Sequence, residues 1–254
     1  MKIAKLKPLS AALGLAAFLA TSSTHAQDVI FGSAQTITGD ANLIDAADTA
    51  GAINVDAILP GSVASSSLTA NGVMFNLSSF STTSASDGKI TLTANATTPA
   101  FSPDHFTTYG NNALFGGGSS AFNAVMNAGG LYGSAGTISI SAAALTAGDT
   151  YDIQIFNYSG DGANESTTFT SGGSNVTLFD DNGSHVGQFV TGTFTATGSS
   201  ETISFGQPTG SYTPVVGAIN LVEVTAVPEP STFALLGAML LLVPGLRMLR
   251  QQAR

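Results

Sequence analysis

The sequence predicts an all-β fold for residues 27–226, an antiparallel two-sheet β-sandwich of the jelly-roll kind. Three observations predict it. Short runs rich in β-branched and aromatic residues recur along the chain, and most alternate polar with apolar residues at period two. Turn-forming Gly, Asn, Asp and Pro separate these runs. The spacing of about 8 to 15 residues leaves no room for the crossover helices that parallel strands need.

The first half of this region alternates strands with turns and then changes character. Between 97 and 118 the pattern gives way to Pro, Asn and Gly with scattered aromatic residues, which predicts a long loop. Ser119 or Ser120 is placed to cap a short helix with Phe122, Val125 and Met126 on one buried face. The strands expected before this loop are 29–31, 35–38, 53–59, 73–77 and 89–94.

The second half shows the alternation more clearly. Each run has one wet and one buried face, as strands of antiparallel sheets do. About 200 residues can bury a real core as one domain, and no tandem repeat is evident. The strands expected here are 137–141, 151–156, 175–179, 190–196, 201–205 and 218–224.

The charge of this region restricts its partners. Lys89 is its only Lys or Arg, whereas fifteen of the sixteen acidic residues lie within it. A surface of that sign repels nucleic acid and anionic lipid headgroups, so we expect neither as a partner. Divalent cations or cationic matrix components fit the charge better. Cysteine is absent, so stability must come from the core and not from disulfides.

The first 26 residues have the pattern of a secretory signal peptide. Lys2, Lys5 and Lys7 precede an apolar stretch over 9–20, and small residues lead to a cleavage site between Ala26 and Gln27. The apolar stretch is only about a dozen residues long, which is short for a membrane span. An N-terminal membrane anchor is the alternative.

The last 28 residues, 227–254, fall into three zones. Pro228, Glu229 and Pro230 form a stiff, extended motif. The uncharged stretch 231–246 spans roughly 24 Å as a helix, and snorkelling arginines extend the predicted transmembrane segment to about 231–249. The basic tail, 247–254, stays cytoplasmic, which leaves the preceding chain outside. Its orienting residues are Arg247, Arg250 and Arg254.

This three-zone tail resembles the PEP-CTERM sorting signal of bacteria with two membranes. The resemblance implies that the tail holds the exported protein at the inner membrane until an exosortase, a membrane protease, cleaves near the motif. It implies release towards the cell surface or matrix. This chain departs from the family in Pro244, which kinks the apolar segment, and in arginines that are spread instead of clustered. A plain tail anchor after a Pro-rich linker is the alternative.

A second resemblance concerns the later strands. The segments 145–156, 192–196 and 216–221 look like the corresponding strands of galactose-binding-like jelly rolls, which occur in many PEP-CTERM proteins. The residues that carry this resemblance are mostly core and turn residues. It therefore implies a fold more than it implies a ligand.

Residues able to carry chemistry are few. His105 and His185 are the only histidines after residue 26, and no Gly-x-Ser-x-Gly elbow accompanies them, so we expect no catalytic residues and no enzyme. Asp180 and Asp181 are better explained as part of a hairpin turn between Phe179 and Val186 than as a catalytic pair.

Metal binding is also weakly indicated. A calcium site at Asp180 and Asp181, or around Asp161, Asn164 and Glu165, is an alternative because these are oxygen ligands. The EF-hand spacing is missing, so we expect no metal site and no cofactor.

Sugar binding needs a flat aromatic ring against the apolar face of the sugar. The candidates are tyrosines in expected loops, although packing is the commoner role for each of them. They are Tyr109, Tyr132, Tyr158 and Tyr212. The sequence therefore predicts an exported, exosortase-processed, non-catalytic protein of the cell surface or extracellular matrix. A carbohydrate-binding module for surface or matrix polysaccharide is the alternative.

Overall fold

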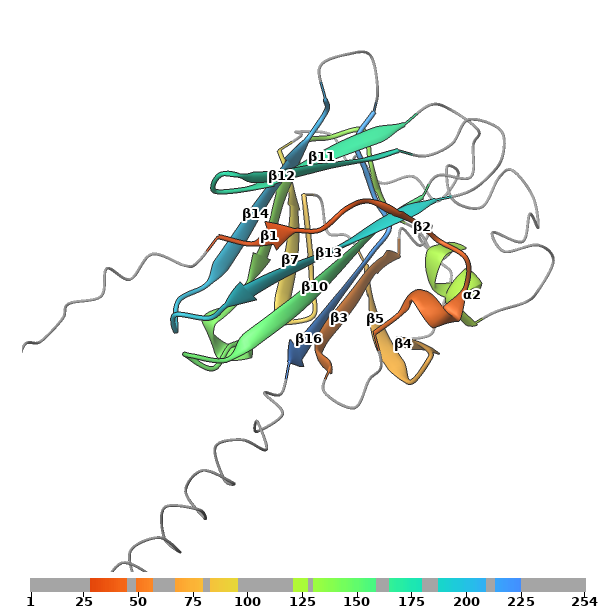
Figure 1. Cartoon of the computed structure of the whole chain (residues 1–254). Coiled ribbons are helices and arrows are strands. Elements are labelled where there is room, and N and C mark those ends of the chain that lie inside the picture. The colour runs from red at the N-terminus through yellow and green to blue at the C-terminus, as the bar shows by residue number, and fades with distance from the viewer. Residues whose placement is uncertain are drawn as a thin grey trace, which may run out of the picture.

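The protein is mostly β in the computed structural model (Figure 1). The structure describes residues 28–44, 49–56, 67–79, 83–95, 121–127, 130–158, 165–179, 187–208 and 213–224.

Eight strands form the larger sheet, sheet A. Strand β2 pairs with β13 beside β1, so the start of the described chain lies along one edge of this sheet. In spatial order the other seven are β1 (Ile30–Phe31), β13 (Gln188–Thr195), β10 (Thr150–Asn157), β16 (Ala218–Val224), β3 (Thr49–Asp56), β5 (Val73–Ser79) and β4 (Ser67–Ala70), and β2 is Gln35–Thr36.

Six strands form the second sheet, sheet B, which is antiparallel throughout the described pairs. Its order is β12 (Ser174–Phe179), β11 (Ser166–Ser171), β14 (Glu201–Gly206), β9 (Gly136–Ile140), β7 (Ile90–Ala94) and β6 (Ser84–Ser86). The remaining elements are a two-stranded sheet of β15 (Val215–Val216) and β8 (Leu131–Tyr132), the helix α2 (Ala121–Asn127), and the 3-10 turns Asp40–Asn42 and Ala142–Ala144.

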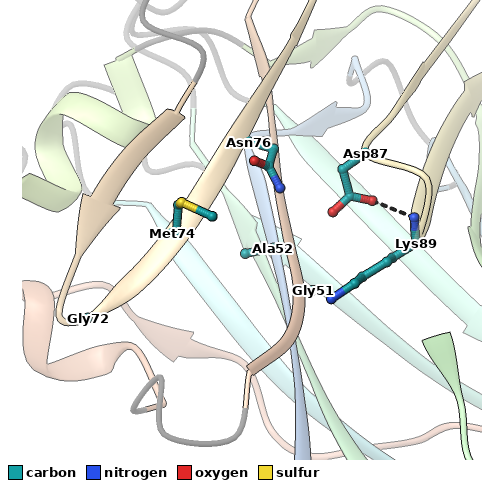
Figure 2. A pocket seen from close by; sticks show the side chains of 7 residues that line it. All are labelled: Gly51, Ala52, Gly72, Met74, Asn76, Asp87 and Lys89. Atoms are coloured by element: carbon teal, nitrogen blue, oxygen red, sulfur yellow. Dashed lines mark hydrogen bonds between the residues drawn. The ribbon is translucent and has the colours of Figure 1, made fainter.

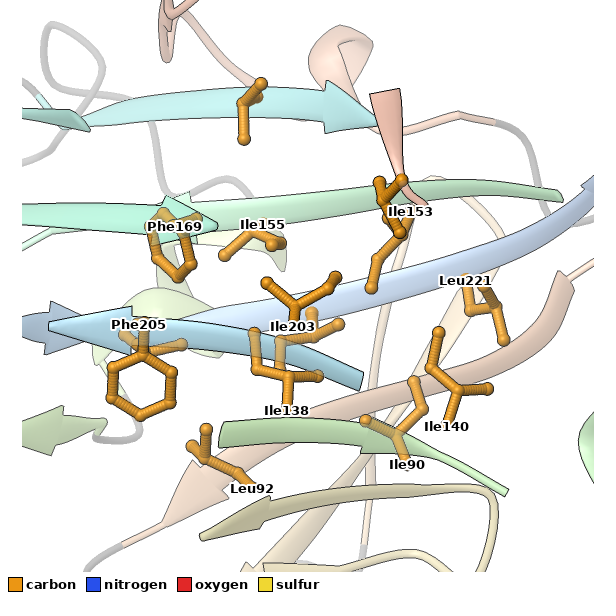
Figure 3. Packing of buried hydrophobic residues seen from close by; sticks show 14 of the residues in the cluster. Ile90, Leu92, Ile138, Ile140, Ile153, Ile155, Phe169, Ile203, Phe205 and Leu221 are labelled. Atoms are coloured by element: carbon orange, nitrogen blue, oxygen red, sulfur yellow. The ribbon is translucent and has the colours of Figure 1, made fainter. Parts of the chain in front are cut away.

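The two large sheets share one hydrophobic core. Ile153 and Leu221 of sheet A lie in the same buried cluster as Ile90, Ile138 and Ile203 of sheet B, as Figure 3 shows. Strands β7 and β9 alternate strictly between buried and half-buried positions. The β-sandwich character predicted from this alternation is therefore confirmed.

A second core covers the opposite face of sheet A. Helix α2 turns Phe122, Val125 and Met126 into it, all fully buried, as the helical spacing predicted. The ring of Phe122 meets that of Phe156 edge to face, with centroids 4.9 Å apart. Because Ile155, the neighbour of Phe156, lies in the first core, β10 is buried on both faces.

One pair of strands corrects the expectation of a purely antiparallel fold. Strands β3 and β5 run parallel. The cause is the tight turn at Asn71 and Gly72, both with positive φ, which folds β4 back onto β5. The hairpin places β5 between β3 and β4, so β5 runs in the direction of β3.

The predicted strands differ from the observed ones in two main respects besides this parallel pair. Strand β3 begins at Thr49, earlier than the expected 53–59. Strands β4, β6, β8, β11 and β15 were not predicted. Within the described residues, no helix has the length and apolarity needed to cross a membrane.

Candidate functional site

Most of the predicted site residues lie outside the described part of the chain. This applies to both predicted cleavage regions, to the predicted transmembrane segment at about 231–249, and to both histidines. These residues are Ala26, Gln27, His105, Tyr109, Asp161, Asn164, Asp180, Asp181, His185, Tyr212, Pro228, Glu229, Pro230, Arg247, Arg250 and Arg254.

Three predicted candidates lie within the described residues, and none offers an open site. Tyr158 is only 2% exposed and belongs to the second core, so its ring cannot stack on a sugar. Tyr132 is half-buried against the same core. Glu165 is buried just before β11. Across the described ranges, no three His, Cys, Asp or Glu side chains come together as a metal site would need.

The expected hairpin after Phe179 is wrong. Strand β12 pairs with β11 in sheet B, whereas the next strand, β13, belongs to sheet A. The two strands therefore do not pair with each other, and Asp180 and Asp181 themselves lie outside the described residues. A side-chain contact still joins the two strands, because the backbone N–H of Phe179 donates to Oε1 of Gln188 at 2.8 Å.

The outer face of sheet B carries an ordered array of hydroxyl groups, which we call the hydroxyl face. The alternation that buries one side of each strand leaves Ser and Thr on the other side, all exposed or half-buried. Register aligns them in two rows across the sheet. The first row is Thr170, Ser204, Thr137, Thr93 and Ser84, and the second is Thr202, Ser139, Thr91 and Ser86.

The spacing of the hydroxyl face follows from sheet geometry. Neighbouring strands lie about 4.8 Å apart, and every second residue along a strand is about 6.7 Å from the last. Both rows consist of uncharged residues, although the chain as a whole is acidic. Ser86 and Thr91 share a hydrogen bond of 2.8 Å between their hydroxyls. The surface thus offers regularly spaced, neutral donors and acceptors.

A shallow cavity of about 190 Å³ opens on this face, at the level of strands β11 and β14. Its lining residues are Thr168, Thr170, Ser204, Phe205, Gly206 and Gln207. Thr168 is held by a 2.8 Å hydrogen bond to the hydroxyl of Thr177 on β12. Polar and apolar groups therefore line the cavity together, and the Thr168–Thr177 bond holds part of its polar wall in place.

A second cavity, of about 240 Å³, lies where strands β3 and β5 meet the turn before β7 (Figure 2). Its charged residues are engaged in holding that turn. Oδ1 of Asp87 accepts the backbone N–H groups of Lys89 and Ile90 at 2.8 and 2.7 Å. The ammonium group of Lys89 donates to the carbonyl of Ala50 on β3. The remaining lining residues are Gly51, Ala52, Gly72, Met74 and Asn76.

Asp87 and Lys89 in the second cavity form hydrogen bonds that hold the turn before β7. The hydroxyl face, in contrast, presents the same kind of polar group at regular intervals. We therefore take the hydroxyl face as the candidate binding site. Sequence reasoning did not single it out. The available signal was the Ser and Thr at alternate positions of 89–94, 137–141 and 201–205, but aligning them required strand register.

No protein-family model matches the chain, and neither a curated protein nor a solved structure matches it significantly.

Proposed function

We propose that this chain is an exported, non-catalytic protein of the bacterial cell surface or extracellular matrix. Its tail anchors it in the inner membrane until an exosortase-type protease cleaves near Pro228, Glu229 and Pro230. The observation that carries the proposal is the three-zone segment 227–254: a stiff motif, an uncharged stretch and a basic end. The motif is a substrate site, and its residues perform no chemistry.

The position of the last described strand, β16, is compatible with cleavage near the motif. Strand β16 ends at Val224 and is hydrogen-bonded on both sides, to β10 and to β3. The motif begins four residues later. A cut there leaves all of β16 in the centre of sheet A, so the β-sandwich keeps its hydrogen bonds and its core after the tail is removed.

The direct test replaces Pro228, Glu229 and Pro230 by alanine in the full chain, expressed in the native host. We expect the variant to stay in the membrane fraction at full length, while wild type is shortened and released. Replacing Gln251 and Gln252 by alanine is the control, because it changes the same tail without touching the motif. Release of the triple variant at the wild-type rate would exclude the proposed processing.

A second candidate function, binding of a polysaccharide, is favoured by the hydroxyl face. Its Ser and Thr hydroxyls can donate to and accept from sugar hydroxyls at regular intervals. The face is neutral within an acidic protein, which favours a neutral polysaccharide over an acidic one. The binding would depend on hydrogen bonds over a flat surface instead of stacking on Tyr158, which is buried.

This candidate is tested by co-sedimentation of the full chain with insoluble neutral polysaccharides. Ser204→Glu places a charge in the first row, between Thr170 and Thr137, and Thr69→Glu places the same charge on sheet A as a control. Both positions are exposed in the structure. We expect Ser204→Glu to lose binding and Thr69→Glu to retain it. Equal binding by the two variants would remove the hydroxyl face as the site.

A further inference from the structure

Strand β1 is a two-residue strand at one edge of the sandwich. It pairs with β13 of sheet A and also contacts β12 of sheet B (Figure 1). Ile30 in this strand is 62% exposed, whereas Val29, just before it, is fully buried in the core that the two sheets share. Few backbone pairs therefore hold β1 in place, and Val29 anchors it in the core.

One hydroxyl group links β1 to a buried carboxyl group. The hydroxyl of Ser171, at the end of β11, accepts a hydrogen bond from the backbone N–H of Val29 at 2.9 Å. The same hydroxyl donates to Oε1 of Glu201, at the start of β14, at 3.3 Å. Val29, Ser171 and Glu201 thus form a continuous chain of hydrogen bonds. A further bond, from the backbone N–H of Phe31 to the hydroxyl of Ser174 at 3.0 Å, fixes β1 to β12.

The position of Glu201 is unfavourable for a negative charge. Glu201 is only 3% exposed, and its Oε2 atom has no hydrogen-bond partner among the described residues. Burial raises the pKa of Glu201, hydrogen bonds from the Ser171 hydroxyl and the Thr202 backbone lower it, and the charge of Asp28 raises it again. An ionised Glu201 would therefore be a buried charge without a counter-charge, which is costly.

Asp28 is the charged neighbour that acts on Glu201, and it precedes Val29 directly in the chain. Strands β1, β9, β11, β12 and β13 contain no ionisable residue. Strand β10 and the turn before it carry Asp149, Tyr151 and Asp152, but of the described charges only that of Asp28 shifts the pKa of Glu201. The repulsion that Glu201 meets on ionising therefore comes from the segment that leads into β1.

We propose that Glu201, Ser171 and Asp28 form a proton-controlled latch, which holds residues 28–31 on the sandwich and releases them when Glu201 ionises. In the closed arrangement the protonated carboxyl group brings no charge into the core. On ionisation, the least costly way to bring water to the carboxylate is to detach β1, because β9, β11 and β14 have longer backbone ladders. The like charge of Asp28 leaves with it. The latch does not depend on the proposed export.

The direction of the switch follows from the two arrangements. In the open one Glu201 is solvated and titrates near its ordinary pKa of 4.5, whereas in the closed one its pKa is raised. Below about pH 4.5 both arrangements keep the proton, so the latch stays closed. As pH rises through the raised value, the open arrangement is favoured. Release uncovers the backbone edge of β13 that β1 and Gly32 otherwise occupy, and such an edge can pair with another strand.

Hydrogen–deuterium exchange of the full chain tests the latch. Exchange of the peptide that contains the amides of Val29 and Phe31 is followed at about pH 4 and at about pH 7. Wild type and Glu201→Gln are compared at each pH, so that intrinsic exchange rates cancel. Glu201→Gln keeps an oxygen acceptor for Ser171 but removes the charge. We expect similar exchange at the acidic pH and about tenfold faster exchange in wild type at the neutral pH.

Two further variants separate the contributions of charge. Asp28→Asn, at an exposed position, removes the repulsion and should slow the neutral exchange of wild type by a smaller factor than Glu201→Gln does. Asp152→Asn keeps an oxygen acceptor for Thr193 on the outer face of sheet A. It is the matched control and should exchange like wild type.

The amides of Ile138 and Ile203, in the middle of sheet B, distinguish local release from general opening of the sandwich. We expect their exchange to differ between wild type and Glu201→Gln much less than that of residues 29–31. Neutral exchange of residues 29–31 in wild type that equals that of Asp28→Asn or of Glu201→Gln would overturn the latch. So would an equal acceleration at Ile138 and Ile203, because the whole sandwich would then open.

Discussion

The carboxylate of Asp28 occupies the space above Gly172, where an added Cβ would lie 1.8 Å from its Oδ2 atom. The contact joins the start of the folded chain to the turn between β11 and β12. Together with the hydrogen bond from Val29 to Ser171, it fixes the first described residues against sheet B. The two residues are far apart in the sequence. Their contact lies next to β1, which pairs with β13 of sheet A and also contacts β12 of sheet B.

Replacing Gly172 by alanine should destabilise the protein by about 1–2 kcal/mol, because φ is positive there and the new Cβ must displace Asp28. The measurement is the urea midpoint of the full chain. Gly173→Ala is the control in the same turn, since nothing lies within 4 Å of its added Cβ. Identical midpoints for the two variants would show that Asp28 and the backbone adapt freely.

Glu201 should make stability depend on pH. Its folded-state pKa is raised above 4.5, chiefly by burial, with Asp28 acting in the same direction. The folded chain therefore keeps this proton to a higher pH than the unfolded chain does. The resulting stabilisation is complete below about pH 4.5 and is lost as pH rises through the raised value.

Urea midpoints of the chain with its signal peptide retained, measured from about pH 4 to pH 7, test this dependence. Wild type should lose stability over the range, and Glu201→Gln should lose less. A steeper decline for Glu201→Gln than for wild type would contradict the sign.

Strand β14 provides a test of which face is the core. Ile203 is fully buried between the sheets, whereas its neighbour Ser204 points outward on the hydroxyl face. Ile203→Ala should cost about 2–5 kcal/mol of unfolding free energy, and Ser204→Ala should stay within about 0.5 kcal/mol of wild type. Chemical denaturation of both variants measures the difference. Similar costs at the two positions would contradict the assigned faces.

The extent to which the sequence predicts this fold differs among its strands. Strands with apolar residues at every second position, such as β9 and β14, were predicted because one buried face imposes the period. Strand β11 was missed because Phe169 is its only large apolar residue. Its buried positions also include Ser166, Thr167 and Ser171, which pattern alone does not distinguish from a turn.

Other features of the structure could not be predicted because they depend on pairing between segments that are far apart in the sequence. The parallel pairing of β3 and β5 depends on a hairpin inserted between them, and periodicity carries no information about insertion order. The cluster of Asp28, Ser171 and Glu201 and the rows of the hydroxyl face both depend on register between distant strands. The export signals, in contrast, are local in sequence, so the proposed destination was predicted from residue type and order alone.

We propose that both ends of the chain are removed during export. The most direct measurement is the intact mass of the protein recovered outside cells of the native host. The account predicts a chain that begins at Gln27 and ends close to Pro228, Glu229 and Pro230, without Arg254. Recovery of an extracellular chain that still ends in Arg254 would contradict it.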